Sequence, residues 1–147
     1  MKHIFLNTVI ASIALFSVSS AMAQKAHGPI TSTDLGKNLR VCYDISGLGN
    51  VTEVQITLSY SATVFAECFN PGNKDESVPA HNRVVPSSGE TFTAPVRNGR
   101  AVACFNSTTV FSPGSCPNPN WTGVVTDVSF SNITLTVLGK TFNVQNP

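Results

Sequence analysis

The stretch VTEVQITLSYSATVFAECFN, residues 51–70, decides the fold of this 147-residue chain. Every even position from Val54 to Cys68 is apolar, and the odd positions between them are mostly Thr, Ser, Gln and Glu. This alternation predicts a β-strand with one face in a hydrophobic core. No Gly or Pro interrupts the stretch, and at about 3.3 Å per residue the alternating run spans about 45 Å. Because such a strand is longer than most, we expect it to bend and to serve two sheets.

The rest of the chain also has the pattern of β structure. No window shows the 3.6-residue apolar period of a helix, whereas alternating stretches separated by turn residues recur. The dipeptide Asn98-Gly99 predicts a two-residue type I′ hairpin between residues 90–96 and 101–105. A change of apolar parity at Ser131-Asn132 predicts a bulge or a turn.

These patterns predict about seven strands, at residues 39–46, 51–70, 90–96, 101–105, 124–130, 133–137 and 141–144. Turn signals between strands in a single domain, residues 39–147, favour an antiparallel β-sandwich that is immunoglobulin-like in general architecture. A closed barrel is the alternative. Residues 70–88 are expected to be a loop, and residues 24–38, which show no periodicity, a flexible N-terminal arm.

Residues 1–23 have the pattern of a signal peptide. A short basic start precedes an apolar run over residues 4–18, and Ala21-Met22-Ala23 places small residues at the −3 and −1 positions of a cleavage site. The apolar run is shorter than a membrane span requires. We therefore expect cleavage before Gln24 and a secreted protein, extracellular or periplasmic; the alternative is an uncleaved membrane anchor.

The charge of the chain disfavours some classes of partner. Without Lys2, eight of the nine Lys and Arg residues remain against eight Asp and Glu, so the mature chain is close to neutral. The charges are scattered singly, which gives no electrostatic footprint for nucleic acid or for an anionic membrane. A neutral chain also has little repulsion to oppose self-association.

The four cysteines, Cys42, Cys68, Cys104 and Cys116, are expected to form two disulfides in an oxidising compartment. Zinc is the alternative, but no two cysteines have the close spacing of a zinc site. Strand parity places Cys42 and Cys104 on the polar faces of their strands and Cys68 on the apolar face of the long strand. The pairs Cys42–Cys104 and Cys68–Cys116 follow, and the second pair would fix the Pro-rich loop that carries Cys116.

No set of residues has the pattern of a catalytic or cofactor site. His27 lies in the N-terminal arm, and His81 lies in a loop near serines, which are abundant everywhere in this chain. There is no G-x-S-x-G motif, and no pair of carboxylates stands out. We therefore expect a protein that is not an enzyme and that holds no metal or cofactor; a small hydrolase ranks third among the functions considered.

The one unusual local string is Cys116-Pro-Asn-Pro-Asn-Trp-Thr122. Its prolines and a disulfide would hold Trp121 rigidly, and a rigid exposed aromatic ring suits a sugar face or a protein pocket. Candidate binding residues are therefore Trp121 and Asn120, with Phe65 and Phe69 on the polar face of the long strand. The alternative, which we favour, is that Trp121 packs into the open end of the sandwich.

The polar face of the long strand also carries a ladder of uncharged hydroxyl residues, Thr57, Ser59, Ser61 and Thr63. If this strand lies at a sheet edge, its free backbone groups would pair with another subunit. The ladder therefore predicts self-association into a homo-oligomer or polymer, by strand pairing or by face stacking.

Three strings stand out together: Cys68-Phe-Asn-Pro-Gly72, the CPNPNWT string at residues 116–122, and Val125-Thr-Asp-Val128. They resemble a family of small secreted bacterial β-rich proteins of unassigned function that carries a CPNPNWT motif. The similarity covers most of residues 48–138. It implies export, β architecture and a Cys68–Cys116 link, and it supplies no catalytic or ligand residues.

The sequence favours a non-catalytic secreted protein with a structural or adhesive role, either on the cell surface or as a subunit of an extracellular assembly. The alternative is a binding module for a carbohydrate or a surface protein that uses Trp121 and exposed Phe residues.

Overall fold

The computed structural model describes residues 23–80, 83–86 and 89–147. The expected signal peptide, apart from Ala23, and the candidate histidine His81 lie outside these residues. The described ranges hold ten strands: β1 Lys25–Ala26, β2 Thr31–Asp34, β3 Leu39–Ser46, β4 Glu53–Asn70, β5 Asn73–Pro79, β6 Arg83–Pro86, β7 Glu90–Pro95, β8 Arg100–Asn106, β9 Thr122–Val137 and β10 Lys140–Asn143. None of these described residues belongs to a helix long and apolar enough to cross a membrane.

The strands form two antiparallel sheets that pack face to face. In the four-stranded sheet, β1 and β2 lie along one edge of β3, and β8 lies along the other. In the six-stranded sheet, β4 has β9 on one side and β7, β6 and β5 in succession on the other, and β10 pairs with the end of β9. The predicted antiparallel β-sandwich is therefore confirmed, with a single hydrophobic cluster filling the space between the sheets.

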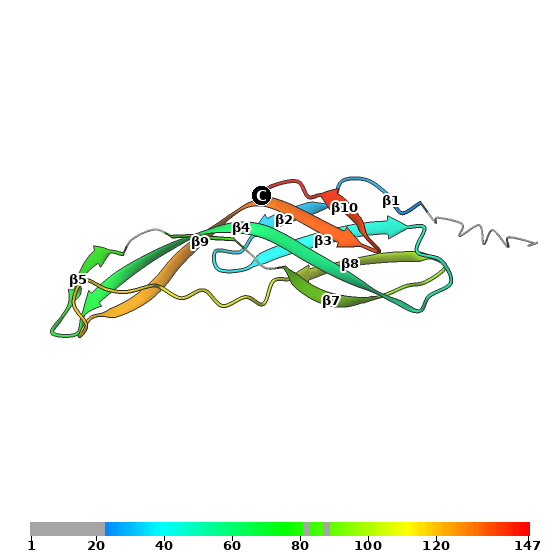
Figure 1. Cartoon of the computed structure of the whole chain (residues 1–147). Coiled ribbons are helices and arrows are strands. Elements are labelled where there is room, and N and C mark those ends of the chain that lie inside the picture. The colour runs from blue at the N-terminus through cyan, green and yellow to red at the C-terminus, as the bar shows by residue number, and fades with distance from the viewer. Residues whose placement is uncertain (1–22, 81–82, 87–88) are drawn as a thin grey trace, which may run out of the picture.

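The two sheets differ in length, and this gives the molecule two parts (Figure 1). Where the sheets face each other they form the part that we call the body. The six-stranded sheet continues beyond the body as a three-stranded arm, made of β5, residues 66–70 of β4 and residues 122–125 of β9. A small second cluster of buried side chains, Ala66, Cys68 and Ala80, lies in this arm. The inner face of the arm is covered by the loop between β8 and β9, because Cys116 and Trp121 pack there.

The alternation in β4 does what the sequence predicted, although the strand does not change sheets. Its even-numbered side chains from Val54 to Cys68 are buried, and its odd-numbered ones face outward. The strand stays in the six-stranded sheet and serves both the body and the arm. The expectation that it would serve two sheets is therefore wrong, since the excess length extends past the body instead of folding over it.

The change of apolar parity at Ser131-Asn132 in β9 is a bulge, which is one of the two outcomes predicted, a bulge or a turn. Asn132 has a positive φ of 51°, and the register with β4 shifts between Ser59 and Ser61. A second shift lies between Phe65 and Ala66 of β4, where β9 carries Thr126 as an extra residue. This second bulge buries Val125 and turns Val124 outward.

The turn at Asn98-Gly99 forms, but the two strands that it joins separate. Both residues have positive φ, and Arg97 and Arg100 exchange two backbone hydrogen bonds. Beyond the turn β7 pairs with β4, whereas β8 pairs with β3. The expected side-by-side hairpin is therefore a link between the sheets. The apolar residues of its strands meet across the core instead, as the Phe92 and Phe105 rings show with centroids 3.7 Å apart.

Two segments expected to lack regular structure contain strands. In residues 24–38, β1 and β2 pair with β3, so this segment is part of the body and is not a loose arm. In residues 70–88, β5 pairs with residues 67–70 of β4, and β6 pairs with residues 61–64 of β4. These strands are short and lack a clear apolar alternation, which is why their sequences did not reveal them.

The C-terminal segment closes one side of the body. Gln145 pairs with Thr31 of β2, and its carbonyl oxygen accepts a hydrogen bond from the backbone N–H of Ser32 at 3.2 Å. The β7–β8 link closes the opposite side. Both lateral openings of the sandwich are therefore bridged by the chain itself.

Candidate functional site

Both disulfides join the pairs that strand parity predicted. Cys42 and Cys104 lie directly opposite each other on β3 and β8 and are bonded on the outer face of the four-stranded sheet. Cys68 is fully buried in β4 and is bonded to Cys116 in the loop after β8. The first bond links neighbouring strands of the body, whereas the second fastens a loop to the arm. Both bonds suit an oxidising environment.

The hydroxyl ladder of β4 does not lie at a sheet edge. Its members, Thr57, Ser59, Ser61 and Thr63, pair with β9 on one side of the strand. On the other side, β7 pairs with Thr57 and β6 pairs with Ser61 and Thr63. The expectation of a free edge is therefore wrong, because β6 comes from a segment that was expected to be a loop. Of the two modes of association, strand pairing through this ladder is excluded and face stacking remains.

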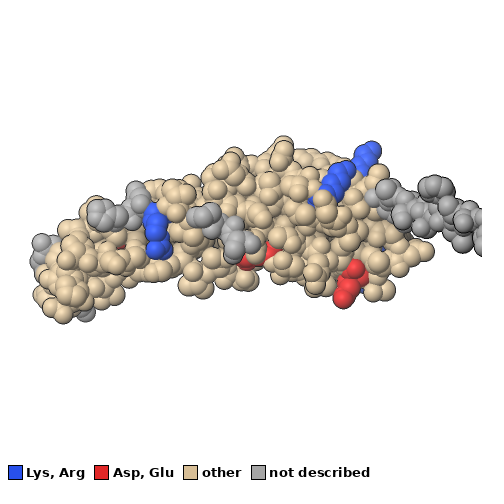
Figure 2. All heavy atoms as spheres, in the orientation of Figure 1, with Lys and Arg blue, Asp and Glu red and all other residues tan. Residues whose placement is uncertain are grey.

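The ladder is part of a wider surface on the outside of the six-stranded sheet. Its partners on β7 and β9 are also Ser or Thr, since Thr57 pairs with Thr91 and with Thr136. On β6 its partners are Pro86 and Val84. Thr141 of β10 continues the surface beyond Thr136. We call this surface the hydroxyl face; it consists of Thr57, Ser59, Ser61, Thr63, Thr91, Ser129, Ser131, Thr134, Thr136 and Thr141. Some of the hydroxyls bond to each other, as Thr57 and Thr91 do at 3.2 Å. Charged side chains are few and separate in the view of Figure 2.

The predicted aromatic binding residues are not brought together. Trp121 is half-buried and packs against the arm cluster of Ala66, Cys68 and Ala80, on the inner side of the sheet. Phe65 and Phe69 are half-buried on the outer side. Asn120 is exposed within the turn that the Trp121 N–H closes by donating to the Asn118 carbonyl at 3.0 Å. We favoured a packed Trp121 over an exposed one, and the ring does pack. It packs against the arm, however, and not into an open end of the body.

A Ser–His contact is present on the four-stranded sheet. His27 Nε2 lies 2.6 Å from Ser46 Oγ, which is within the reach of a nucleophile–base pair. Both carboxylate oxygens of the neighbouring Asp44 are bound by Arg100, one of them by Arg100 Nε at 2.6 Å. The carboxylate therefore holds Arg100 instead of orienting the imidazole, and the arrangement does not reproduce a Ser-His-Asp triad.

The Glu90 carboxylate of β7 fastens the start of the loop between β8 and β9. It accepts hydrogen bonds from Tyr60 Oη at 2.7 Å, from Thr108 N at 2.6 Å and Oγ1 at 3.0 Å, and from Thr109 Oγ1 at 2.5 Å. Partial burial alone would raise the pKa of Glu90. The hydrogen bonds from Thr108, Thr109 and Tyr60 outweigh this effect and lower the pKa below its ordinary value. The ionised carboxylate thus connects β4, β7 and the loop.

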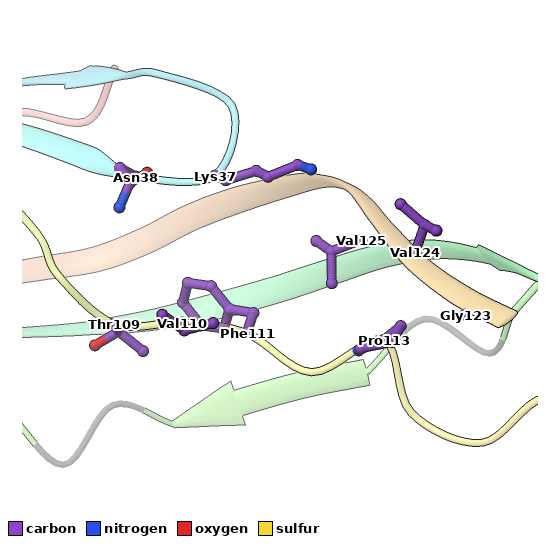
Figure 3. A pocket seen from close by; sticks show the side chains of 9 residues that line it. All are labelled: Lys37, Asn38, Thr109, Val110, Phe111, Pro113, Gly123, Val124 and Val125. Carbon is purple, nitrogen blue, oxygen red and sulfur yellow. The ribbon is translucent and has the colours of Figure 1, made fainter.

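A hollow of about 420 Å³ lies where the arm leaves the body (Figure 3). Lys37 and Asn38 form one wall, in the turn between β2 and β3. The loop between β8 and β9 forms the opposite wall, and the start of β9 lies between them. The lining residues are Lys37, Asn38, Thr109, Val110, Phe111, Pro113, Gly123, Val124 and Val125.

Sequence reasoning named no residue of this hollow as a candidate for binding or catalysis. Lys37 and Val110 come from segments without periodicity, and only the fold brings them near β9. A weak signal existed in Gly123, directly before the predicted strand 124–130, since a glycine at a strand can mark the close approach of another backbone. A Cβ at Gly123 would lie 3.0 Å from Pro113 Cβ and 3.3 Å from Cys116 Sγ, so the glycine allows the loop to approach β9.

Among the described residues, no group of three or more His, Cys, Asp or Glu side chains is arranged to hold a metal ion. Comparison of the chain with family models, with curated proteins and with solved structures finds no match in any of the three.

Proposed function

We propose that this chain is a secreted, non-catalytic structural or adhesive protein of the cell surface, which associates with copies of itself through the hydroxyl face. The observation that carries the proposal is the composition of that face. Neighbouring strands present Ser and Thr to one another in register, and none of the residues that pair with Thr57, Ser59, Ser61 or Thr63 is charged.

The physical argument is one of desolvation. Burying a charged side chain in an interface is costly unless it is paired, whereas a hydroxyl group both donates and accepts hydrogen bonds. Two hydroxyl faces that stack can therefore satisfy each other without charge pairing. The near-neutral mature chain adds little long-range repulsion between copies. The arm supports a surface role, because it extends the six-stranded sheet beyond the body (Figure 1).

The test is the state of association of the mature protein, measured by light scattering after size exclusion and by electron microscopy. We expect oligomers or polymers, and we expect Ser131→Lys and Ser61→Lys to weaken them while the fold is kept. Val102→Lys is the matched control, because Val102 is 62% exposed on the other sheet. A monomer at high concentration, or assemblies that tolerate Ser131→Lys, would contradict the proposal.

The export step has its own test. Mass spectrometry of the exported protein should find an N-terminus at Gln24, and retention of Met1 would contradict the proposed cleavage.

A further inference from the structure

The two disulfides differ in how far each cysteine is open to solvent. Cys104 is exposed on the outer face of the four-stranded sheet, and its partner Cys42 is half-buried beside it. In the second bond, Cys68 is fully buried and Cys116 is half-buried against the arm cluster. No cysteine in the described part of the chain is free. Of the four cysteines, Cys104 alone is therefore exposed.

The strands around the exposed bond leave one approach to it open. A thiolate attacks a disulfide in line with the S–S bond, from the side away from the sulfur that leaves. The bond bridges β3 and β8, so attack on Cys42 would come over β2, where Thr31 pairs with Cys42. Attack on Cys104 would come from the far side of β8, which pairs with β3 alone among the described strands. The approach to Cys104 therefore crosses no other strand of the sheet.

The second bond offers no comparable approach. Cys68 lies between two paired strands, because β5 pairs with it through Val78 and β9 pairs with it through Gly123. Cys116 does border a surface hollow of about 280 Å³. Attack there, however, would release Cys68 as a thiolate inside an apolar cluster, where an unpaired charge is costly. Exchange at the second bond is therefore disfavoured at either sulfur.

The body keeps its strands together without the exposed bond. β3 and β8 form a ladder of seven residue pairs, and their inward side chains, such as Val41 and Ile45, are fully buried. If the bond opens, Cys42 and Cys104 still face each other on neighbouring strands, so it can form again. The charged neighbours of Cys42 along β3 are Arg40 and Asp44, and Asp44 is bound by Arg100.

We propose that Cys104 is a site of reversible modification by a low-molecular-weight thiol, with Cys42 as the resolving cysteine. The thiolate of the small molecule forms a bond to Cys104 Sγ, and the bond between Cys104 and Cys42 breaks. The electron pair leaves on Cys42 Sγ, which takes a proton from water. One disulfide replaces another, so no net oxidation occurs, and attack by Cys42 on Cys104 Sγ releases the small thiol again. The proposal is independent of the hydroxyl face, which lies on the other sheet.

The experiment treats the mature protein with reduced glutathione in the absence of denaturant. N-ethylmaleimide then stops the exchange, and peptide mapping by mass spectrometry locates both labels. We expect glutathione on Cys104 with maleimide on Cys42, about tenfold or more above the opposite arrangement, because exchange follows access to the attacked sulfur. Cys68–Cys116 should stay intact and the circular dichroism spectrum should not change. An unreactive Cys42–Cys104 bond, equal amounts of glutathione on both residues, or equally fast opening of Cys68–Cys116 would overturn the proposal.

Two matched lysine substitutions test the side of approach. Asn106 follows Cys104 by two residues on the outer face of β8, Thr31 pairs with Cys42 on β2, and both side chains are exposed. Glutathione is an anion, so a lysine beside its path should speed the exchange. We expect Asn106→Lys to raise the rate about two- to fivefold, Thr31→Lys to raise it less, and neutral 2-mercaptoethanol to react with both variants as with the wild type. An equal or larger effect of Thr31→Lys would place the attack at Cys42 and overturn the assignment.

Discussion

The body and the arm share two strands but are stabilised in different ways. In the body, two sheets enclose large aliphatic side chains such as Leu39, Ile56 and Leu135, which are fully buried. In the arm, a single sheet is covered by a loop, and the buried residues are small, with Ala66 and Ala80 beside Cys68. The body therefore depends on apolar area removed from water, whereas the arm depends on the Cys68–Cys116 bond and on the packing of Trp121 against a small cluster. One long alternating sequence thus serves two kinds of packing.

The largest expected effect comes from the core of the body. Leu135→Ala removes most of a fully buried side chain, and we expect a loss of about 2–5 kcal/mol in the free energy of unfolding, measured by urea denaturation. Val78→Ala is the matched change in the arm, where Val78 is only partly buried. It should cost about 1 kcal/mol or less. Equal costs at the two positions would contradict the distinction between body and arm.

Removing each disulfide in turn should distinguish the body from the arm more clearly. Their sequence separations are similar, 62 residues for Cys42–Cys104 and 48 for Cys68–Cys116, so chain entropy predicts nearly equal losses of about 2–4 kcal/mol. The double change Cys68→Ala with Cys116→Ala should also abolish hydrogen-exchange protection in β5. The change of Cys42 and Cys104 to Ala should leave β3 and β8 protected, because their ladder and the core persist. Protected β5 amides after loss of Cys68–Cys116 would show that the arm does not depend on the bond.

The Glu90 contacts join the loop to the body and make its attachment dependent on pH. The pKa of Glu90 is lower in the folded protein than the value of about 4.3 in an unfolded chain. Its contribution to stability is therefore present above that value and is lost as pH falls through the folded pKa. Glu90→Gln should cost about 1–2 kcal/mol at neutral pH, since an amide cannot accept all these hydrogen bonds. The difference from the wild type should shrink in acid, and a difference independent of pH would contradict this account.

The smallest effect is expected at the ion pair on the outside of the body. Arg100 lowers the pKa of Asp44 through its hydrogen bonds and its charge, but both groups are at the surface. Asp44→Asn should therefore barely shift the urea midpoint, and the shift should disappear at high salt. A large effect that persists at high salt would mean that the pair is shielded from solvent.

The contrast between body and arm also shows which features of the fold could be predicted from the sequence. The long strand, the bulge near Asn132 and both disulfide pairs follow from the alternation of apolar residues, which is a local property of the chain. The hydroxyl ladder was found, but its place inside the sheet was not, because β6 has only four residues and no clear pattern. The aromatic candidates were wrongly grouped, since Trp121 and Phe65 lie on opposite sides of the six-stranded sheet.

The sequence by itself determined which residues alternate between core and solvent, where turns of positive φ occur, and which cysteines share a face. Each of these depends on a few neighbouring residues, whose backbone and side-chain preferences act over short distances. Only the tertiary structure decided that β7 and β8 join different sheets and that β4 has strands on both of its sides. It also decided that Lys37 and Val110 line the same hollow. Those arrangements depend on contacts between residues far apart in the chain, because strand pairing and packing select among registers that local patterns leave equivalent.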